Sequence, residues 1–202
     1  MKKWHLILAA AAVLSLQAPV MPAEAADVAV PDDIFQWVQS TARQNYYFNK
    51  QQIKYGIDAQ GNVDLNTLIV PTLRTYDDIQ IRDVVTKRRW KMLSVKGYER
   101  LIGSAKYLKF NLKAQTVQIV EQDDLDDTFT SINQDLDPEP AVNYATLSEK
   151  DVDGCFYRAI IKYAQKHQDE LIARTGAPLS KADAIALGKA QPDQGKHKHK
   201  KG

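Results

Sequence analysis

The order in which strand-like and helical patterns follow one another is the feature that most constrains the fold of this chain. From residue 34 to residue 121, short runs rich in β-branched and aromatic residues alternate with turn residues, whereas apolar residues recur at helical spacing after residue 148. Strands that precede a terminal helical segment are typical of α+β proteins, not of alternating βαβ folds. We therefore expect an α+β fold, with a small, mostly antiparallel sheet of hairpins and a long C-terminal helix packed on one face.

Two hairpins are predicted from turn chemistry. Gly61, in the run DAQGN, tolerates a positive φ and joins the first pair of strands, and residues 113–115 join the second pair. Pro71 cannot donate a ladder hydrogen bond, so it predicts an edge or a bulge at that point. The expected strands are 34–41, 45–58 in one or two pieces, 63–76, 104–112 and 116–121.

Helices are expected where a capping residue precedes apolar positions three and four apart. Asp77 or Asp78 would begin one helix that runs to about Met92, and Ser180 would begin a short one. The clearest helix is predicted from Ser148 to Arg174, because Asp151 follows Ser148 at capping-box spacing. Its apolar stripe comprises Val152, Cys155, Phe156, Ala159, Ile160, Tyr163, His167 and Leu171.

The two ends of the chain differ in composition from the rest. Lys2 and Lys3 precede an apolar run of 11 residues and then the small residues of AEA, so we interpret residues 1–25 as a signal peptide cut between Ala25 and Ala26. The run is too short to span a bilayer, which needs about 20 residues, and no later segment is apolar for long enough. Residues 26–190 would form one domain. Residues 191–202 are basic and lack apolar residues, which predicts a disordered tail.

Charge is segregated along the middle of the chain. Eight carboxylates and no lysine or arginine lie in residues 121–140, whereas ten basic residues lie in residues 82–113. We interpret the acidic stretch as a loop that folds back near the basic segment. A calcium site there stays open, but the alternating D-x-D-x-D-G spacing is absent and residues 121–140 contain no glycine.

One basic cluster is the best candidate for contact with a partner. The run KRRWK places four cations around a tryptophan, which could bind an anionic glycan, a lipid headgroup or a loop of an envelope protein. The alternative is a solvated helix face with Trp90 tucked under lysine stems. The candidate residues are Lys87, Arg88, Arg89, Trp90 and Lys91.

Enzymatic signatures are missing from the sequence. His167 is the only histidine outside the predicted signal peptide and tail, and about 18 Å of helix would separate it from Cys155. Both residues are therefore predicted to serve packing, not nucleophilic catalysis. No phosphate loop, dinucleotide fingerprint or zinc-protease motif occurs, so we expect no cofactor and no specific metal site. A net charge of +2, or +1 without Lys2, Lys3 and Glu24, argues against nucleic acid as a partner.

The layout of residues 37–128 resembles small exported bacterial proteins of the surface-adhesin protein E type. The resemblance rests on the signal peptide, WVQST at residue 37, YYF at residue 46 and a long strand through residues 68–70. It implies an α+β fold and a binding role at the cell envelope, and it carries over no functional residue. We thus expect a periplasmic or secreted, non-catalytic binding module. The alternatives are a carboxylate-based hydrolase or an accessory subunit of an envelope complex.

Overall fold

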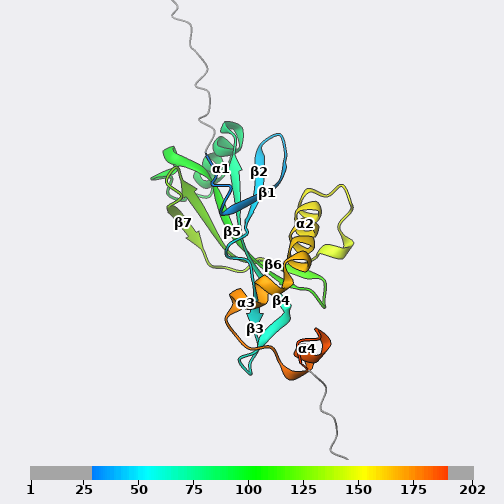
Figure 1. Ribbon diagram of the computed structural model, residues 1–202. Coiled ribbons are helices and arrows are strands. Elements are labelled where there is room, and N and C mark those ends of the chain that lie inside the picture. Colours follow the sequence, from blue (N-terminus) through cyan, green and yellow to red (C-terminus); the bar gives the residue numbers. More distant parts are fainter. Residues whose placement is uncertain (1–28, 191–202) are drawn as a thin grey trace, which may run out of the picture.

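The computed structural model describes residues 29–190, which form an antiparallel sheet of eight strands with four α-helices (Figure 1). The α+β class is therefore confirmed. The strands are β1 (Phe35–Ser40), β2 (Gln44–Asn49), β3 (Lys54–Ile57), β4 (Val63–Tyr76), β5 (Leu101–Asn111), β6 (Thr116–Asp126), β7 (Ser131–Asp135) and β8 (Val142–Asn143). The helices are α1 (Asp78–Trp90), α2 (Val152–Lys166), α3 (Gln168–Thr175) and α4 (Lys181–Ala186).

The strands lie in the order β1-β2-β4-β5-β6-β7, with β3 paired to β4 and β8 paired to β6. β2 and β3 share one side of the long strand β4: β2 pairs with Thr72–Tyr76, and β3 pairs with the stretch from Val63 to Ile69. Pro71 falls in the gap between these two pairings. On its other side Pro71 pairs with Tyr107 of β5, so the proline lies in a central strand that has a local edge on one side only.

Both predicted hairpins are confirmed, and the second is longer than expected. Ile57 pairs with Val63 across the turn in which Gly61 has a φ of 82°. β5 and β6 run on past the predicted ends, so that Leu101 pairs with Asp126. The backbones of β4 and β5 approach closely at Gly103, where a Cβ would lie 2.0 Å from the carbonyl oxygen of Arg74.

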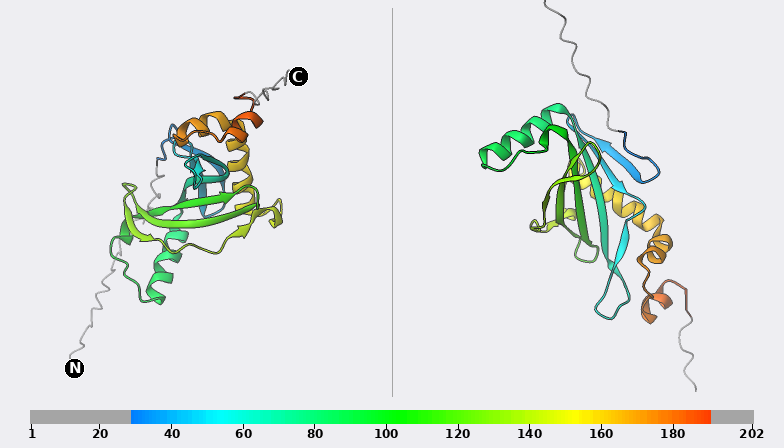
Figure 2. Two further views of the ribbon diagram at one scale, coloured as in Figure 1. Left: turned by 90° about the horizontal axis from the view of Figure 1, so that it is seen from below. Right: turned by 90° about the vertical axis from the view of Figure 1, so that its left-hand side faces the viewer.

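The main core lies between one face of the sheet and the helices that follow β8. Phe48, Phe110 and Phe156 are fully buried there, and aromatic edges meet ring faces where Tyr46 contacts Phe156 and Phe110 contacts Tyr157. The opposite face carries a smaller cluster of Leu73, Ile102 and Leu125, covered by residues from the N-terminal segment. Figure 2 shows α2 lying along the sheet and α1 extending away from it.

The predicted single helix from Ser148 to Arg174 is wrong. α2 begins after Asp151, whose carboxylate accepts a hydrogen bond from the N–H of Gly154, and it ends at His167, where φ and ψ are −110° and 23°. α3 then takes a new direction and packs on β3, where the Thr175 hydroxyl accepts from the N–H of Tyr55. β3 pairs only with the N-terminal part of β4. Because the sheet twists, β3 runs at an angle to the strands under α2, and a straight continuation of α2 would not pack on it.

The predicted signal peptide and basic tail lie outside the described residues, as does the cut between Ala25 and Ala26. Within residues 29–190, none of the helices combines the length and the apolar character that crossing a bilayer would require.

Candidate functional site: the exposed end of helix α1

Helix α1 begins where β4 ends and leads away from the body of the protein. Asp77 caps it by accepting a hydrogen bond from the N–H of Gln80 at 2.7 Å, as the sequence predicts. No residue of α1 is fully buried. The end that carries Trp90 is the part of α1 farthest from the sheet, and the chain turns back from it toward β5 (Figure 2).

Large apolar side chains at this end face solvent. Trp90 is 80% exposed, Met92 is 94% exposed and Leu93 is 48% exposed. Trp90 is therefore not tucked under lysine stems, although this end of the helix is solvated as the alternative predicts. Exposed cations surround these three side chains. We call this surface the α1 tip and define it as Lys87, Arg89, Trp90, Lys91, Met92, Leu93 and Lys96.

Arg88 belongs to the same run of sequence but points inward and anchors the tip. Its side chain is 16% exposed, and its guanidinium lies 4.4 Å from the centre of the Tyr98 ring and 3.7 Å from the Asp124 carboxylate. Its Nε also donates to the carbonyl oxygen of Ser94 at 3.0 Å. The structure thus separates one anchoring residue from the four other candidates, Lys87, Arg89, Trp90 and Lys91, which are exposed.

The turn beyond α1 is held in shape by its own backbone. The N–H of Met92 donates to Arg89, and the N–H of Leu93 donates to Arg88. Met92 has a φ of 54°, a left-handed conformation that non-glycine residues adopt infrequently. The left-handed turn leaves its large apolar side chain in solvent, and such conformations gather at functional sites. Met92 and Leu93 could not be predicted as site residues, because residue type does not reveal which apolar side chains a turn leaves exposed.

The acidic stretch is a strand and a hairpin, not a loop. Residues 121–126 lie in β6, and Asn133 in β7 pairs with Asp124. The predicted approach of acidic and basic segments is confirmed, since Arg88 faces Asp124, and Arg100 contacts Asp126 and Asp127. Tyr98 donates to Asp124 at 2.5 Å, and burial together with this carboxylate raises the pKa of the Tyr98 hydroxyl.

No calcium site is assembled from these carboxylates. Asp123 and Asp124 are neighbours in a strand, so their side chains point to opposite faces of the sheet. In the part of the chain that the structure describes, no three histidine, cysteine, aspartate or glutamate side chains gather where they could hold a metal.

A cleft between α1 and the sheet tests the hydrolase alternative. It has a volume of about 280 Å³, and Asp124 and Asp135 both line it, beside Lys87 and Arg88. A glycosidase needs one protonated carboxylic acid and one carboxylate flanking the scissile bond. Asp124 instead accepts a hydrogen bond from the Tyr98 hydroxyl and lies 3.7 Å from the Arg88 guanidinium. Asp124 thus belongs to the anchor of α1, and the hydrolase alternative stays a prediction.

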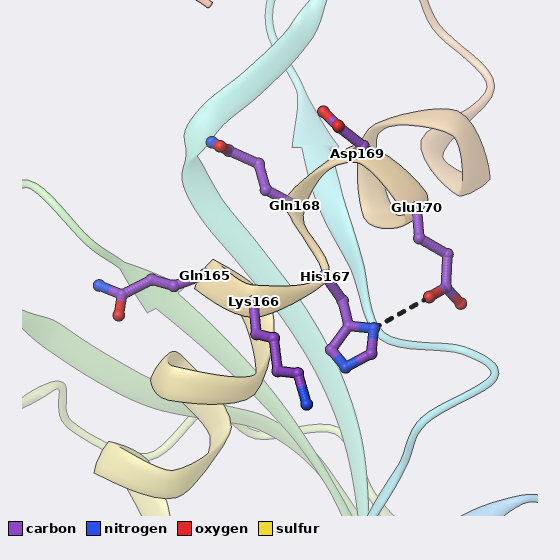
Figure 3. A pocket seen from close by; sticks show the side chains of 6 residues that line it. All are labelled: Gln165, Lys166, His167, Gln168, Asp169 and Glu170. Atoms are coloured by element: carbon purple, nitrogen blue, oxygen red, sulfur yellow. Dashed lines mark hydrogen bonds and ion pairs between the residues drawn. The ribbon is translucent and has the colours of Figure 1, made fainter.

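Cys155 and His167 have structural surroundings. His167 is half-buried, in agreement with its predicted packing role, whereas Cys155 is less buried than predicted. The Cys155 thiol is only partly buried and donates to the carbonyl oxygen of Glu149 at 2.9 Å. His167 lies where α2 gives way to α3, stacks on Tyr163 and pairs with Glu170 at 3.2 Å. A hollow of about 360 Å³ at this point is lined by residues 165–170. Figure 3 shows that their side chains point in different directions. One run of six residues does not make a convergent site.

A polar cluster extends the main core toward α1. Arg74 in β4 lies 4.5 Å over the ring of Tyr46 and bonds Asp153 at the start of α2 at 2.7 Å. Burial, and then the charge of Arg74, lower the pKa of the neighbouring Lys106 amine. Asp153 and Tyr157 lie near the same cations, and burial raises the pKa of Tyr157 to about 12. The cluster fixes α2 to the sheet, and we assign it no ligand.

No family model, curated protein or solved structure matches the chain, so the resemblance to the protein E type stays a prediction.

Proposed function

We propose that this protein is an exported, non-catalytic binding module of the cell envelope, and that the α1 tip is its contact surface. The observation that carries the proposal is the exposure of Trp90 and Met92, at 80% and 94%, at the projecting end of a helix. Contiguous apolar side chains in water are unfavourable unless a partner covers them, and a polar rim is typical of interaction surfaces. Lys87, Arg89, Lys91 and Lys96 supply such a rim.

The experiment is sedimentation of the chain from Ala26 onward with a washed envelope fraction, compared with its recovery alone. A tip variant combines Trp90→Ser, Met92→Ser and Leu93→Ser. A matched control combines Trp37→Ser with Ile57→Ser, because these side chains are also 52% and 60% exposed but lie in β1 and β3. We expect the wild-type chain and the control to sediment with the envelope, and the tip variant to stay in the supernatant.

Melting curves of all three chains check that the substitutions leave the fold intact, since every altered side chain is exposed. Equal sedimentation of the tip variant and the control would contradict the proposal. A wild-type chain that does not sediment with the envelope at all would do the same.

An accessory subunit of an envelope complex is the second candidate. It would use the same surface, because exposed apolar side chains also mark contacts between subunits. The experiments below separate a protein partner from a lipid one.

A further inference from the structure

We infer that the partner of the α1 tip is an anionic lipid bilayer, into which Trp90 and Met92 insert while Lys87, Arg89, Lys91 and Lys96 contact the headgroups. This inference rests on the proposed function and names its ligand class.

The shape of the tip favours a fluid surface over a folded partner. The three apolar side chains of the tip lie within four consecutive residues at the outermost end of α1, and the chain turns back directly after them (Figure 2). Small molecules and sugars are usually bound in concave sites with converging polar groups. The cleft of about 280 Å³ beside α1 is lined by Lys87, Lys91 and Leu93 but not by Trp90 or Met92. The Trp90 and Met92 side chains lie outside this cleft and face solvent, so a bilayer could contact them directly.

The residue types match the chemistry of a bilayer interface. Tryptophan is enriched where headgroups meet acyl chains, because its ring is apolar and its indole N–H can stay hydrated. Methionine has a flexible apolar side chain that suits the acyl region. Long lysine and arginine stems can lie along the apolar layer while their charges reach lipid phosphates. All four cations of the tip are exposed, and no ion pair engages them in the part of the chain that the structure describes.

The anchoring of the tip makes insertion less costly. Arg88 bonds the carbonyl of Ser94 and lies between Tyr98 and Asp124, so the turn that carries Met92 and Leu93 is fixed before any lipid is present. A preorganised surface loses less conformational entropy on binding than a flexible one. Arg88 is therefore a positioning residue, distinct from the residues that contact lipid.

The experiment uses protein-free vesicles and tryptophan fluorescence. After removal of residues 1–25 the chain keeps two of its three tryptophans, Trp37 and Trp90, so Trp37→Phe makes Trp90 the sole reporter. Trp90→Phe gives the matched control, in which Trp37 reports from β1. Both chains are titrated with vesicles of equal parts phosphatidylglycerol and phosphatidylcholine, with vesicles of phosphatidylcholine alone, and with vesicles that carry brominated acyl chains.

We expect the emission of Trp90 to shift to shorter wavelength and to be quenched by brominated lipid in anionic vesicles, while the emission of Trp37 stays unchanged. Each cation near an anionic surface strengthens binding about fivefold, so Lys87→Ser with Lys91→Ser should weaken it about 25-fold. Raising the salt concentration to about 0.5 M should weaken vesicle binding as well, because exposed charges are screened.

Two results would overturn the inference. One is a chain that does not bind anionic vesicles. The other is vesicle binding that leaves Trp90 emission unchanged and is equally strong in the variant with Lys87→Ser and Lys91→Ser. Contact through residues 191–202 alone would produce this result. Suppose that the tip variant still fails to sediment with whole envelopes while protease treatment of those envelopes abolishes sedimentation of the wild-type chain. In that case the lipid inference fails, and the partner of the tip is a protein. Loss of both kinds of binding removes the proposed function as well.

Discussion

Neighbouring aspartates in β6 illustrate how strand geometry gives one residue type two opposite roles. Asp124 points toward Tyr98 and Arg88, which satisfy its charge. Asp123 points to the other face, is 9% exposed and has one carboxylate oxygen without a partner. Burial, and then the charge of Glu121, raise the pKa of the Asp123 carboxyl above its ordinary value of 3.8. The sequence pattern DDLDD does not distinguish the two residues.

Asp123→Asn should stabilise the fold at neutral pH. Because the pKa is raised in the folded state, the folded chain binds a proton at Asp123 more tightly than the unfolded chain does. The stabilisation from this carboxyl is present at low pH and is lost as the pH rises through the raised pKa. Asparagine stays neutral, so at pH 7 the free energy of unfolding should increase. Urea unfolding between pH 4 and 7, in steps of about 1 unit, measures the gain, which should shrink as the pH falls.

The matched variant is Asp124→Asn. It removes a charged acceptor from Tyr98 and Arg88, so it should lower the free energy of unfolding by about 1.5–3 kcal/mol, the usual contribution of a hydrogen bond to a charged group. Opposite signs for two adjacent substitutions would confirm the division of the strand into two faces. A loss of stability in both variants at pH 7 would show that the Asp123 carboxylate is better accommodated than its surroundings suggest.

At the scale of elements, the docking of α2 on the sheet depends on an ion pair with unequal exposure. The Arg74 side chain is 12% exposed, whereas that of Asp153 is 45% exposed. Asp153→Ala would leave a largely buried guanidinium without its carboxylate. Breaking a fully buried pair costs about 3–5 kcal/mol. Because water screens the Asp153 side, we expect a loss of about 1–3 kcal/mol in the free energy of unfolding, measured by urea titration.

A double-mutant cycle separates this pair from its background. In a chain that already carries Arg74→Met, Asp153→Ala should cost less than in the wild-type chain, because no buried charge is left behind. Arg43 and Asp83 supply the control, since their side chains are 48% and 46% exposed, and Asp83→Ala should change stability by less than about 1 kcal/mol. Additive effects of Arg74→Met and Asp153→Ala would rule out the proposed coupling.

Local sequence signals predicted most of the elements because their chemistry is local. Asp77, Gly61 and Ser180 act on backbone groups within a few residues, and each begins or ends an element where the pattern predicts. The break at His167 has no such signal. Apolar spacing continues through Tyr163, His167 and Leu171, and only the position of β3 requires α3 to turn. For the same reason the sequence indicated the cluster at residues 87–91 but did not separate Arg88 from the exposed residues or add Met92 and Leu93.

At the scale of the whole molecule, some charges of the basic segment are paired with carboxylates and others stay exposed at the tip. Of the ten basic residues in 82–113, Arg88 and Arg100 pair with the carboxylates of β6 and of the turn that follows it. Lys106 lies in the polar cluster beside Arg74. Lys87, Arg89, Lys91 and Lys96 stay exposed around Trp90. A chain of nearly neutral overall charge thereby presents one cationic surface with an apolar centre, which net charge alone would not indicate.

Export is the premise on which contact between this surface and the envelope depends, and it can be measured directly. The order of lysines, apolar run and AEA predicts that signal peptidase removes residues 1–25, so the native chain should begin at Ala26. Intact-mass measurement of the protein from fractionated cells should give a chain that lacks residues 1–25 and that is recovered with the periplasm or the medium. Ala25→Tyr should block cleavage, because the peptidase requires a small residue directly before the cut, and the uncut chain should stay bound to the membrane through its apolar run. A native chain that retains Met1 to Ala25 in the cytosol would remove the α1 tip from any envelope surface, whatever its affinity for lipid in vitro.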